Sequence, residues 1–181
     1  MDENEGIRII PIGEDAPSVA GVLTEPLEAR FGRPVRVEPV RWPRGDWYDA
    51  ERGQFRADRI LDHLTEAPSG PGAWSLAILD ADLYAPGLSF VFGQATVGGC
   101  CAVIGLARLR TRTEEGDESD QVLFRRRVLT EAVHELGHVA GLGHCALPCC
   151  VMFFSNSIAE TDRKGPDFCG RCRPGVLGRA A

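Results

Sequence analysis

Residues 134–144 of the chain read HELGHVAGLGH and close a long segment with helical periodicity. On a helix, His134 and His138 are four residues apart and lie about 40° from each other on one face, close enough to share a metal ion. A separate apolar stripe on the same helix can face a core and consists of Leu129, Val133, Leu136 and Ala140. The stretch therefore predicts a helix from about Asp120 to Ala140 that buries one face and turns two imidazoles toward a cleft.

A third imidazole can reach the same ion only if the helix ends. Gly141 permits the positive φ that reverses the chain, so His144 can approach the metal from the other side. Three histidine ligands leave one tetrahedral position open for water, which distinguishes a catalytic zinc from a structural one and brings the pKa of that water to ~7. Glu135 directly follows the first ligand, and its carboxylate is placed to act as the general base.

The cysteines that follow this stretch suggest a second metal. Cys169 and Cys172 form a CxxC pair, and Cys145 with either Cys149 or Cys150 can complete a set of four thiolates. Four thiolates fill the coordination sphere of zinc, so this site would be structural and would fix the loop that carries His144. A redox CxxC or unrelated buried thiols are the alternatives.

The bulk composition restricts the classes of function. The chain has 181 residues, 44 % of them hydrophobic, and a net charge of −6, which argues against general nucleic-acid binding. No stretch approaches the ~18 apolar residues of a membrane span, and the acidic segment from Met1 to Gly6 does not resemble a signal peptide. We therefore expect a cytoplasmic, monomeric protein that binds neither nucleic acid nor membrane. Lys164 is the only lysine, and we assign it no function.

Upstream of the histidines, apolar runs alternate with amphipathic segments. Predicted strands are Ile7–Ile12, Val35–Val40, Trp74–Leu79, Leu88–Phe92 and Cys101–Leu109, and predicted helices are Val19–Phe31, stopped by Gly32, and Phe55–Leu64. This order indicates an α/β fold with a largely parallel sheet, and the short Gly-containing links between the later strands indicate at least one antiparallel strand at an edge. Leu88–Phe92 could be an edge strand to which a peptide adds, or a buried strand.

Two parts of the chain are expected. Residues 1–141 form a sheet-and-helix subdomain that includes the active-site helix. Residues 142–181 are rich in Cys, Pro and Gly and have too few apolar residues for a core of their own. We expect them to form a small C-terminal subdomain held by the structural zinc.

Together these motifs resemble the archaemetzincin family of metzincin-type zinc metallopeptidases. The resemblance lies in the long histidine motif followed by Cys145, then Cys150-Val-Met152, and the later Cys169-Gly-Arg-Cys172. It selects Cys150 over Cys149 as the fourth thiolate, and it makes Met152 the Met-turn residue beneath the catalytic metal. Asp80–Tyr84, the Leu88–Gly93 strand and Phe153–Ser157 also look like the family.

The resemblance implies a twisted N-terminal sheet with backing helices, an active-site helix and a smaller C-terminal lobe. It also implies two zinc ions, one catalytic and one structural, and a peptidase for short peptides or N-termini, with an aminopeptidase among the options. Two alternatives remain at this point. One is a non-catalytic protein whose two zincs organise a peptide-binding surface, and the other is a zinc hydrolase of a non-peptide amide.

Overall fold

A computed structural model of the chain describes residues 6–66, 70, 72–110 and 118–177. Most of the acidic segment from Met1 to Gly6 therefore lies outside the described residues. A five-stranded sheet has the order β2-β1-β5-β8-β7. Its strands, in chain order, are β1 (Ile7–Ile12), β2 (Val35–Val37), β5 (Trp74–Leu79), β7 (Gly93–Ala95) and β8 (Cys101–Gly105). Only the edge strand β7 is antiparallel to its neighbour. The predicted mostly parallel sheet with an antiparallel edge is therefore confirmed.

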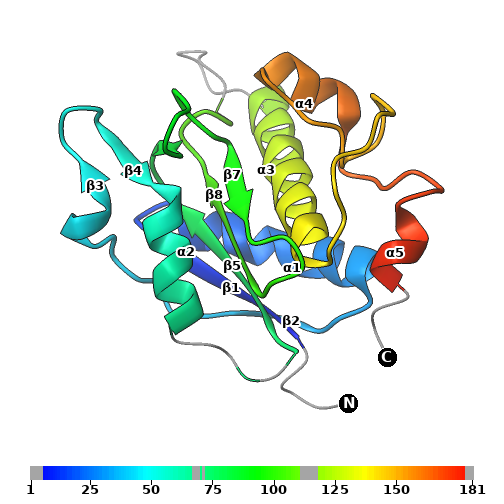
Figure 1. Cartoon of the computed structure of the whole chain (residues 1–181), viewed down its shortest axis with the longest axis horizontal. Helices are drawn as coiled ribbons and strands as arrows, with labels where there is room; N and C mark the ends of the chain where they lie inside the picture. The colour runs from blue at the N-terminus through cyan, green and yellow to red at the C-terminus, as the bar shows by residue number, and fades with distance from the viewer. Residues whose placement is uncertain (1–5, 67–69, 71, 111–117, 178–181) are drawn as a thin grey trace.

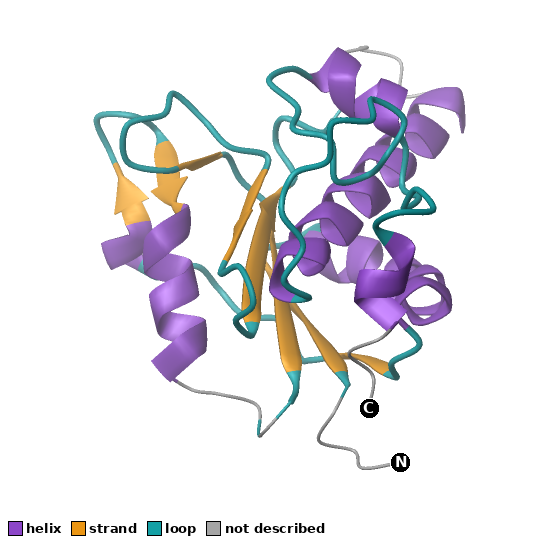
Figure 2. Ribbon diagram, turned by 45° about the vertical axis from the view of Figure 1, so that its right-hand side comes forward, coloured by secondary structure: helices purple, strands orange, loops and turns teal. Residues whose placement is uncertain are grey.

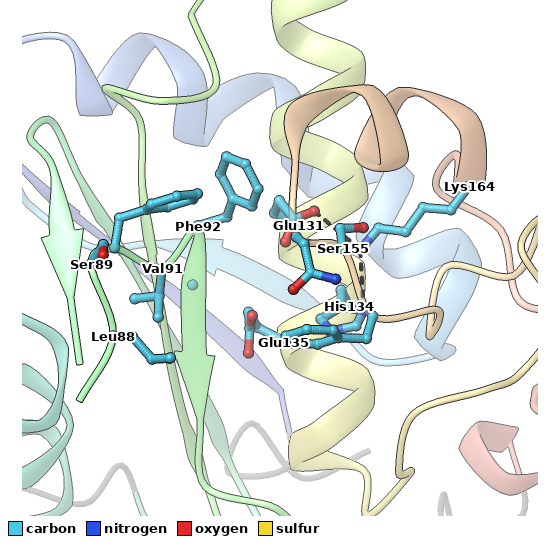
Figure 3. A pocket seen from close by; sticks show the side chains of 13 residues that line it. Leu88, Ser89, Val91, Phe92, Glu131, His134, Glu135, Ser155 and Lys164 are labelled. Atoms are coloured by element: carbon cyan, nitrogen blue, oxygen red, sulfur yellow. Dashed lines mark hydrogen bonds and ion pairs between the residues drawn. The ribbon is translucent and has the colours of Figure 1, made fainter. Parts of the chain in front are cut away.

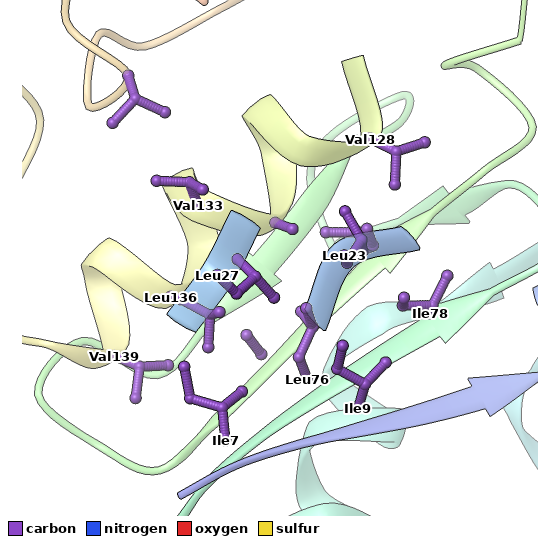
Figure 4. Packing of buried hydrophobic residues seen from close by; sticks show 14 of the residues in the cluster. Ile7, Ile9, Leu23, Leu27, Leu76, Ile78, Val128, Val133, Leu136 and Val139 are labelled. Atoms are coloured by element: carbon purple, nitrogen blue, oxygen red, sulfur yellow. The ribbon is translucent and has the colours of Figure 1, made fainter. Parts of the chain in front are cut away.

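Helices cover both faces of this sheet (Figures 1 and 2). Helices α1 (Ala16–Phe31) and α3 (Glu118–Val139) lie on one face, and α2 (Ala57–Glu66) lies on the other. Side chains alternate along β5, so that Leu76 and Ile78 join the first core while Ala77 and Leu79 join the second. Figure 4 shows the first core, where Leu23 and Leu27 of α1 and Leu136 of α3 meet the sheet.

A smaller three-stranded sheet stands beside the main one. Its order is β3-β4-β6, and it comprises β3 (Tyr48–Asp49), β4 (Gln54–Arg56) and β6 (Leu83–Tyr84), preceded by the short helix η2 (Gly45–Trp47). Phe55 was predicted to begin a helix, and that boundary is wrong. Its backbone N–H donates to the carbonyl of Asp82 at 2.9 Å, so pairing with β6 delays the helix until Ala57.

Three strand predictions also differ from the structure: two extend too far, and one segment is not a regular strand. The strand from Val35 ends at Val37, and the strand from Cys101 ends at Gly105. Leu88–Phe92 is not a regular strand; it has a single bridge, between Val91 and Leu83, before β7 begins at Gly93. Of these three segments only Cys101–Gly105 is fully buried, whereas Val37, Val40 and Leu88 are exposed. An apolar run therefore does not report where a hydrogen-bonding neighbour stops.

The described residues after Gly141, 142–177, form no core separate from that of the sheet. Cys150, Val151, Met152, Phe168 and Val176 belong to the same buried cluster as the sheet and α1. Two short helices, α4 (Ile158–Lys164) and α5 (Arg173–Leu177), lie in this part. Figure 1 shows α4 beside the first half of α3 and α5 beyond its far end. No helix in the described part of the chain is long and apolar enough to cross a membrane.

Candidate metal centre and cleft

Helix α3 brings two imidazoles together. The Nε2 atoms of His134 and His138 are 3.2 Å apart, and the ring centroids are 4.7 Å apart. Two nitrogen ligands of one tetrahedral zinc, each about 2.05 Å from the ion, are separated by about 3.3 Å. The spacing of the two Nε2 atoms therefore fits a shared zinc ion.

Gly141 ends the helix in the way that its sequence position requires. It has a φ of +87°, and its N–H donates to the carbonyl of His138 at 2.8 Å. The turn returns His144 to a ring-centroid distance of 4.8 Å from His138 and 5.5 Å from His134. The ligand atoms of the three imidazoles lie within 4.8 Å of one another.

Backbone carbonyls orient two of the rings. The Nδ1 atom of His134 lies 2.7 Å from the carbonyl of Val151, and that of His138 lies 2.8 Å from the carbonyl of Leu142. A carbonyl can only accept, so both Nδ1 atoms carry the proton and both Nε2 lone pairs are available to a metal. Burial lowers the pKa of all three histidines, which favours the neutral imidazole that binds zinc.

Glu135 lies between the histidine helix and the edge strand β7. It is 5 % exposed, and burial raises the pKa of its carboxyl group well above the usual range, with a further contribution from the charge of Glu131. Gly93 of β7 makes room for it, because a Cβ atom at Gly93 would stand 2.7 Å from Cγ of Glu135. Any larger residue at position 93 would push the carboxylate out of place.

A cavity of about 270 Å³ opens beside Glu135 and His134 (Figure 3). One wall is the segment 88–93, and the opposite wall combines α3 with residues 154–156 and Lys164. Phe154, half exposed, packs its ring against His144 with a centroid distance of 4.9 Å. The cavity therefore places His134 and Glu135 beside a space large enough for a side chain of a substrate.

Lys164, to which the sequence analysis assigned no function, lies at this cavity. It is 4 % exposed, and its Nζ atom is 3.1 Å from Oε1 of Glu131 and 3.4 Å from the carbonyl of Phe153. The hydroxyl of Thr161 donates to the same Glu131 oxygen at 3.0 Å. Two features of the sequence could have indicated that Lys164 and Glu131 lie at the cavity. Lys164 is the only lysine, and Glu131 precedes Glu135 by one helical turn.

The four cysteines of the second predicted site also converge. The Sγ atoms of Cys145, Cys150, Cys169 and Cys172 lie within 4.8 Å of one another. Those of Cys145 and Cys169 are 3.9 Å apart, close to the separation of about 3.8 Å that a tetrahedral zinc with 2.3 Å bonds requires. Cys149 is exposed and lies outside this cluster.

One thiol of the cluster is prepared for metal binding by its own backbone. Hydrogen bonds from the backbone of Cys172 and Arg171 lower the pKa of Cys169 to about 6, so that it is a thiolate at neutral pH.

The two cysteines outside the C-terminal part lie at β8, where Cys101 is buried and Cys100 half-buried. Burial raises the pKa of Cys101 to about 12, consistent with a plain buried thiol.

Met152 lies beneath the histidine helix. It is fully buried, and its carbonyl accepts a hydrogen bond from the N–H of Cys145 at 2.9 Å. Its thioether packs so closely on the backbone of Gly137 that a Cβ atom at this position would overlap the sulfur. The glycine inside the histidine motif is thus explained by the methionine that packs against it.

Three imidazoles on a helix and its terminal turn, a buried glutamate and a methionine beneath them define the class of metzincin-type metal hydrolases. Peptidase family M54 matches residues 35–176 of the chain. An archaemetzincin from Methanopyrus kandleri is 47 % identical over 125 residues, which is 69 % of this chain and 67 % of that protein.

Solved structures agree with this. The crystal structure of archaemetzincin from Archaeoglobus fulgidus complexed with malonate is 39 % identical, covers 94 % of this chain and 99 % of its own, and has a TM-score of 0.82. A zinc-dependent peptidase from Methanocorpusculum labreanum is 27 % identical, covers 94 % and 100 %, and has a TM-score of 0.83. The chain belongs to peptidase family M54, the archaemetzincins, and is a zinc metallopeptidase whose substrates are peptides.

Proposed function

We propose that this chain hydrolyses peptide bonds at a zinc ion held by His134, His138 and His144, with Glu135 as the general base. The observation that carries the proposal is the convergence of three imidazole ligand atoms beside a cavity that His134 and Glu135 line. Bound there, zinc would polarise the scissile carbonyl and acidify the attacking water. Proton transfer is carried out by a side chain of the protein itself.

Glu135 takes the proton from the attacking water and later delivers it to the leaving amine. Its position supports both steps, because the carboxylate lines the cavity beside His134, where the water and the leaving amine would lie. Lys164 and Glu131 form a buried ion pair one helical turn away, which limits the charge in this part of the cavity.

The edge strand β7 supports binding of an extended peptide. Hydrogen bonds link Thr96 to Cys101 and Gly105 to Phe92, so antiparallel alternation directs the backbone groups of Gly93 and Ala95 away from β8. A substrate can add there as a further strand, with its scissile bond beside Glu135. Short peptides and peptide N-termini are the proposed substrates, and peptides with a blocked N-terminus distinguish aminopeptidase from endopeptidase action.

A second, structural zinc is proposed on Cys145, Cys150, Cys169 and Cys172. This cluster adjoins the catalytic ligands at two points, since Cys145 follows His144 and Cys150 precedes Val151, whose carbonyl orients His134. The zinc would thereby hold residues 142–181 as the C-terminal subdomain, with Met152 as the Met-turn residue. The cysteine content favours a reducing compartment, so a cytoplasmic monomer without nucleic-acid partners stays our prediction.

Metal content tests this assignment. The native protein should contain two zinc ions per chain by mass spectrometry. The His138→Ala variant should retain one, because it loses a catalytic ligand but no thiolate. Cys172→Ser should lose the structural zinc and unfold at a lower temperature. One zinc in the native protein, or two in His138→Ala, would contradict the two-site assignment.

A further inference from the structure

The acidic motif at residues 80–84 has a structural role at the cleft. Asp82 accepts two hydrogen bonds from the Arg108 guanidinium, both at 2.8 Å, and one from Nε2 of Gln54 at 3.0 Å. Gln54 is 6 % exposed and is the first residue of β4. Asp82 therefore connects the small sheet to the chain that follows β8, on the side where the cavity wall 88–92 lies.

Backbone hydrogen bonds hold that wall at Val91 and Phe92, whereas side chains hold its first residues, Leu88 and Ser89. Nη2 of Arg52 donates to the carbonyls of Leu88 and Ser89, both at 3.0 Å, and Nε2 of Gln54 donates to the Ser89 carbonyl at 3.1 Å. The Arg108 guanidinium lies 4.2 Å from the ring centroid of Phe90. A single backbone bridge, at Val91, joins the wall to β6. Two arginines and a glutamine thus take the place of a neighbouring strand at Leu88–Phe90.

Arg52 is itself fixed in place. Its Nε donates to Oε1 of Gln54 at 3.0 Å, and its guanidinium lies 4.2 Å over the ring of Tyr84. The hydroxyl of Tyr84 donates to Asp49 at 2.7 Å, and the other oxygen of Asp49 accepts from the N–H of Arg52 at 3.2 Å. Such a constrained guanidinium loses little further entropy when it holds two carbonyls.

We propose that Arg52 is a positioning residue for the substrate, which sets the width of the cavity by holding segment 88–92 in place. The inference rests on the proposed function, because it treats the cavity beside Glu135 as the subsite for a side chain that flanks the scissile bond. Arg52 does not line the cavity and contacts no reacting atom. Its effect on the substrate passes through the carbonyls of Leu88 and Ser89.

The effect of Arg52 on peptide binding should depend on the size of the substrate side chain in the cavity. A large apolar residue that fills the cavity contacts the wall, whereas glycine at the same position leaves the wall untouched. Two peptides that differ only there, Leu against Gly beside the scissile bond, therefore report the wall position. Arg52 is exposed and lies outside both apolar cores, so its replacement should leave the fold and both zinc ions intact.

The experiment compares Arg52→Ala with Arg59→Ala, a matched control from the exposed face of α2. For the Leu peptide, Arg52→Ala should raise KM about tenfold with kcat unchanged, because the wall loses the two hydrogen bonds that hold the carbonyls of Leu88 and Ser89. For the Gly peptide, KM should be unchanged. Arg52→Lys should be intermediate, because a single ammonium group does not reproduce the guanidinium fork. Arg59→Ala should change neither peptide.

Equilibrium binding separates this inference from the proposed function. The same two peptides are titrated calorimetrically into zinc-loaded Glu135→Gln protein, with and without Arg52→Ala. Selective weakening of the Leu peptide supports the role of Arg52 even if the parent enzyme cleaves neither peptide, a result that would refute only the proposed function. Equal losses for both peptides, or no loss for either, would overturn the positioning role.

Discussion

Glu135→Gln should abolish peptide hydrolysis while both zinc ions stay bound. A general base contributes a factor of about 10²–10⁴ in rate, and glutamine has nearly the same shape but cannot accept the proton from water. The side chain of Glu135 fills the gap between α3 and Gly93, so the isosteric change should preserve the packing. Steady-state kinetics on a short peptide, together with zinc analysis, measures both effects.

The control for this variant is Glu25→Gln, on the exposed face of α1 and far along the chain from the histidines. It makes the same chemical change and should leave kcat and zinc content as they are in the native protein. Glu131→Gln is unsuitable as a control because Glu131 is buried and paired with Lys164. Turnover by Glu135→Gln at the native rate would refute the assignment of the base.

Gly137→Ala should destabilise the protein, although the same change stabilises an ordinary helix. Alanine in a helix interior is favoured over glycine by about 1 kcal/mol. At Gly137, however, the added methyl group would overlap the sulfur of Met152 and stand 3.2 Å from the ring of Phe168. Overpacking of this kind costs about 1–3 kcal/mol, so it outweighs the helix preference. Displacement of Met152 should also weaken zinc binding at the histidines above it.

The matched substitution is Gly21→Ala in α1, where a Cβ atom would meet nothing within 4 Å. This variant should gain about 0.5–1 kcal/mol in the free energy of unfolding. Urea denaturation of both variants gives opposite signs if the Met152 contact is as tight as described. A stabilised Gly137→Ala protein with full zinc content would show that the methionine can move aside at no cost.

The two variants probe different requirements of one helix. Glu135 concerns chemistry, and its replacement should leave the free energy of unfolding nearly unchanged. Gly137 concerns packing, and its replacement should lower stability, zinc affinity and activity together. Both residues stand within the same five-residue motif, so the contrast separates the parts of the motif that react from the part that allows the helix to rest on Met152.

Local geometry made the histidine site predictable. All three imidazoles and Glu135 lie within eleven consecutive residues, where the 3.6-residue period of a helix and the positive φ of Gly141 fix their relative directions. The helix stop at Gly32 followed from the same reasoning, and Gly32 has a φ of +63° there. The alternation of strands and helices likewise predicted the parallel sheet, and the short Gly-containing links between the later strands predicted an antiparallel strand at an edge.

Contacts between distant segments were beyond such reasoning. The sequence alone determined an α/β fold, a histidine helix with a returning turn, and a cysteine-rich tail. Each of these features depends on residues that are close together along the chain. Only the tertiary structure decided that Lys164 meets Glu131, that Phe55 pairs with β6, and that Arg52 holds segment 88–92 where a strand was expected. Those contacts join residues that are far apart in the sequence and form only when the whole chain has packed. A local sequence pattern therefore does not predict them.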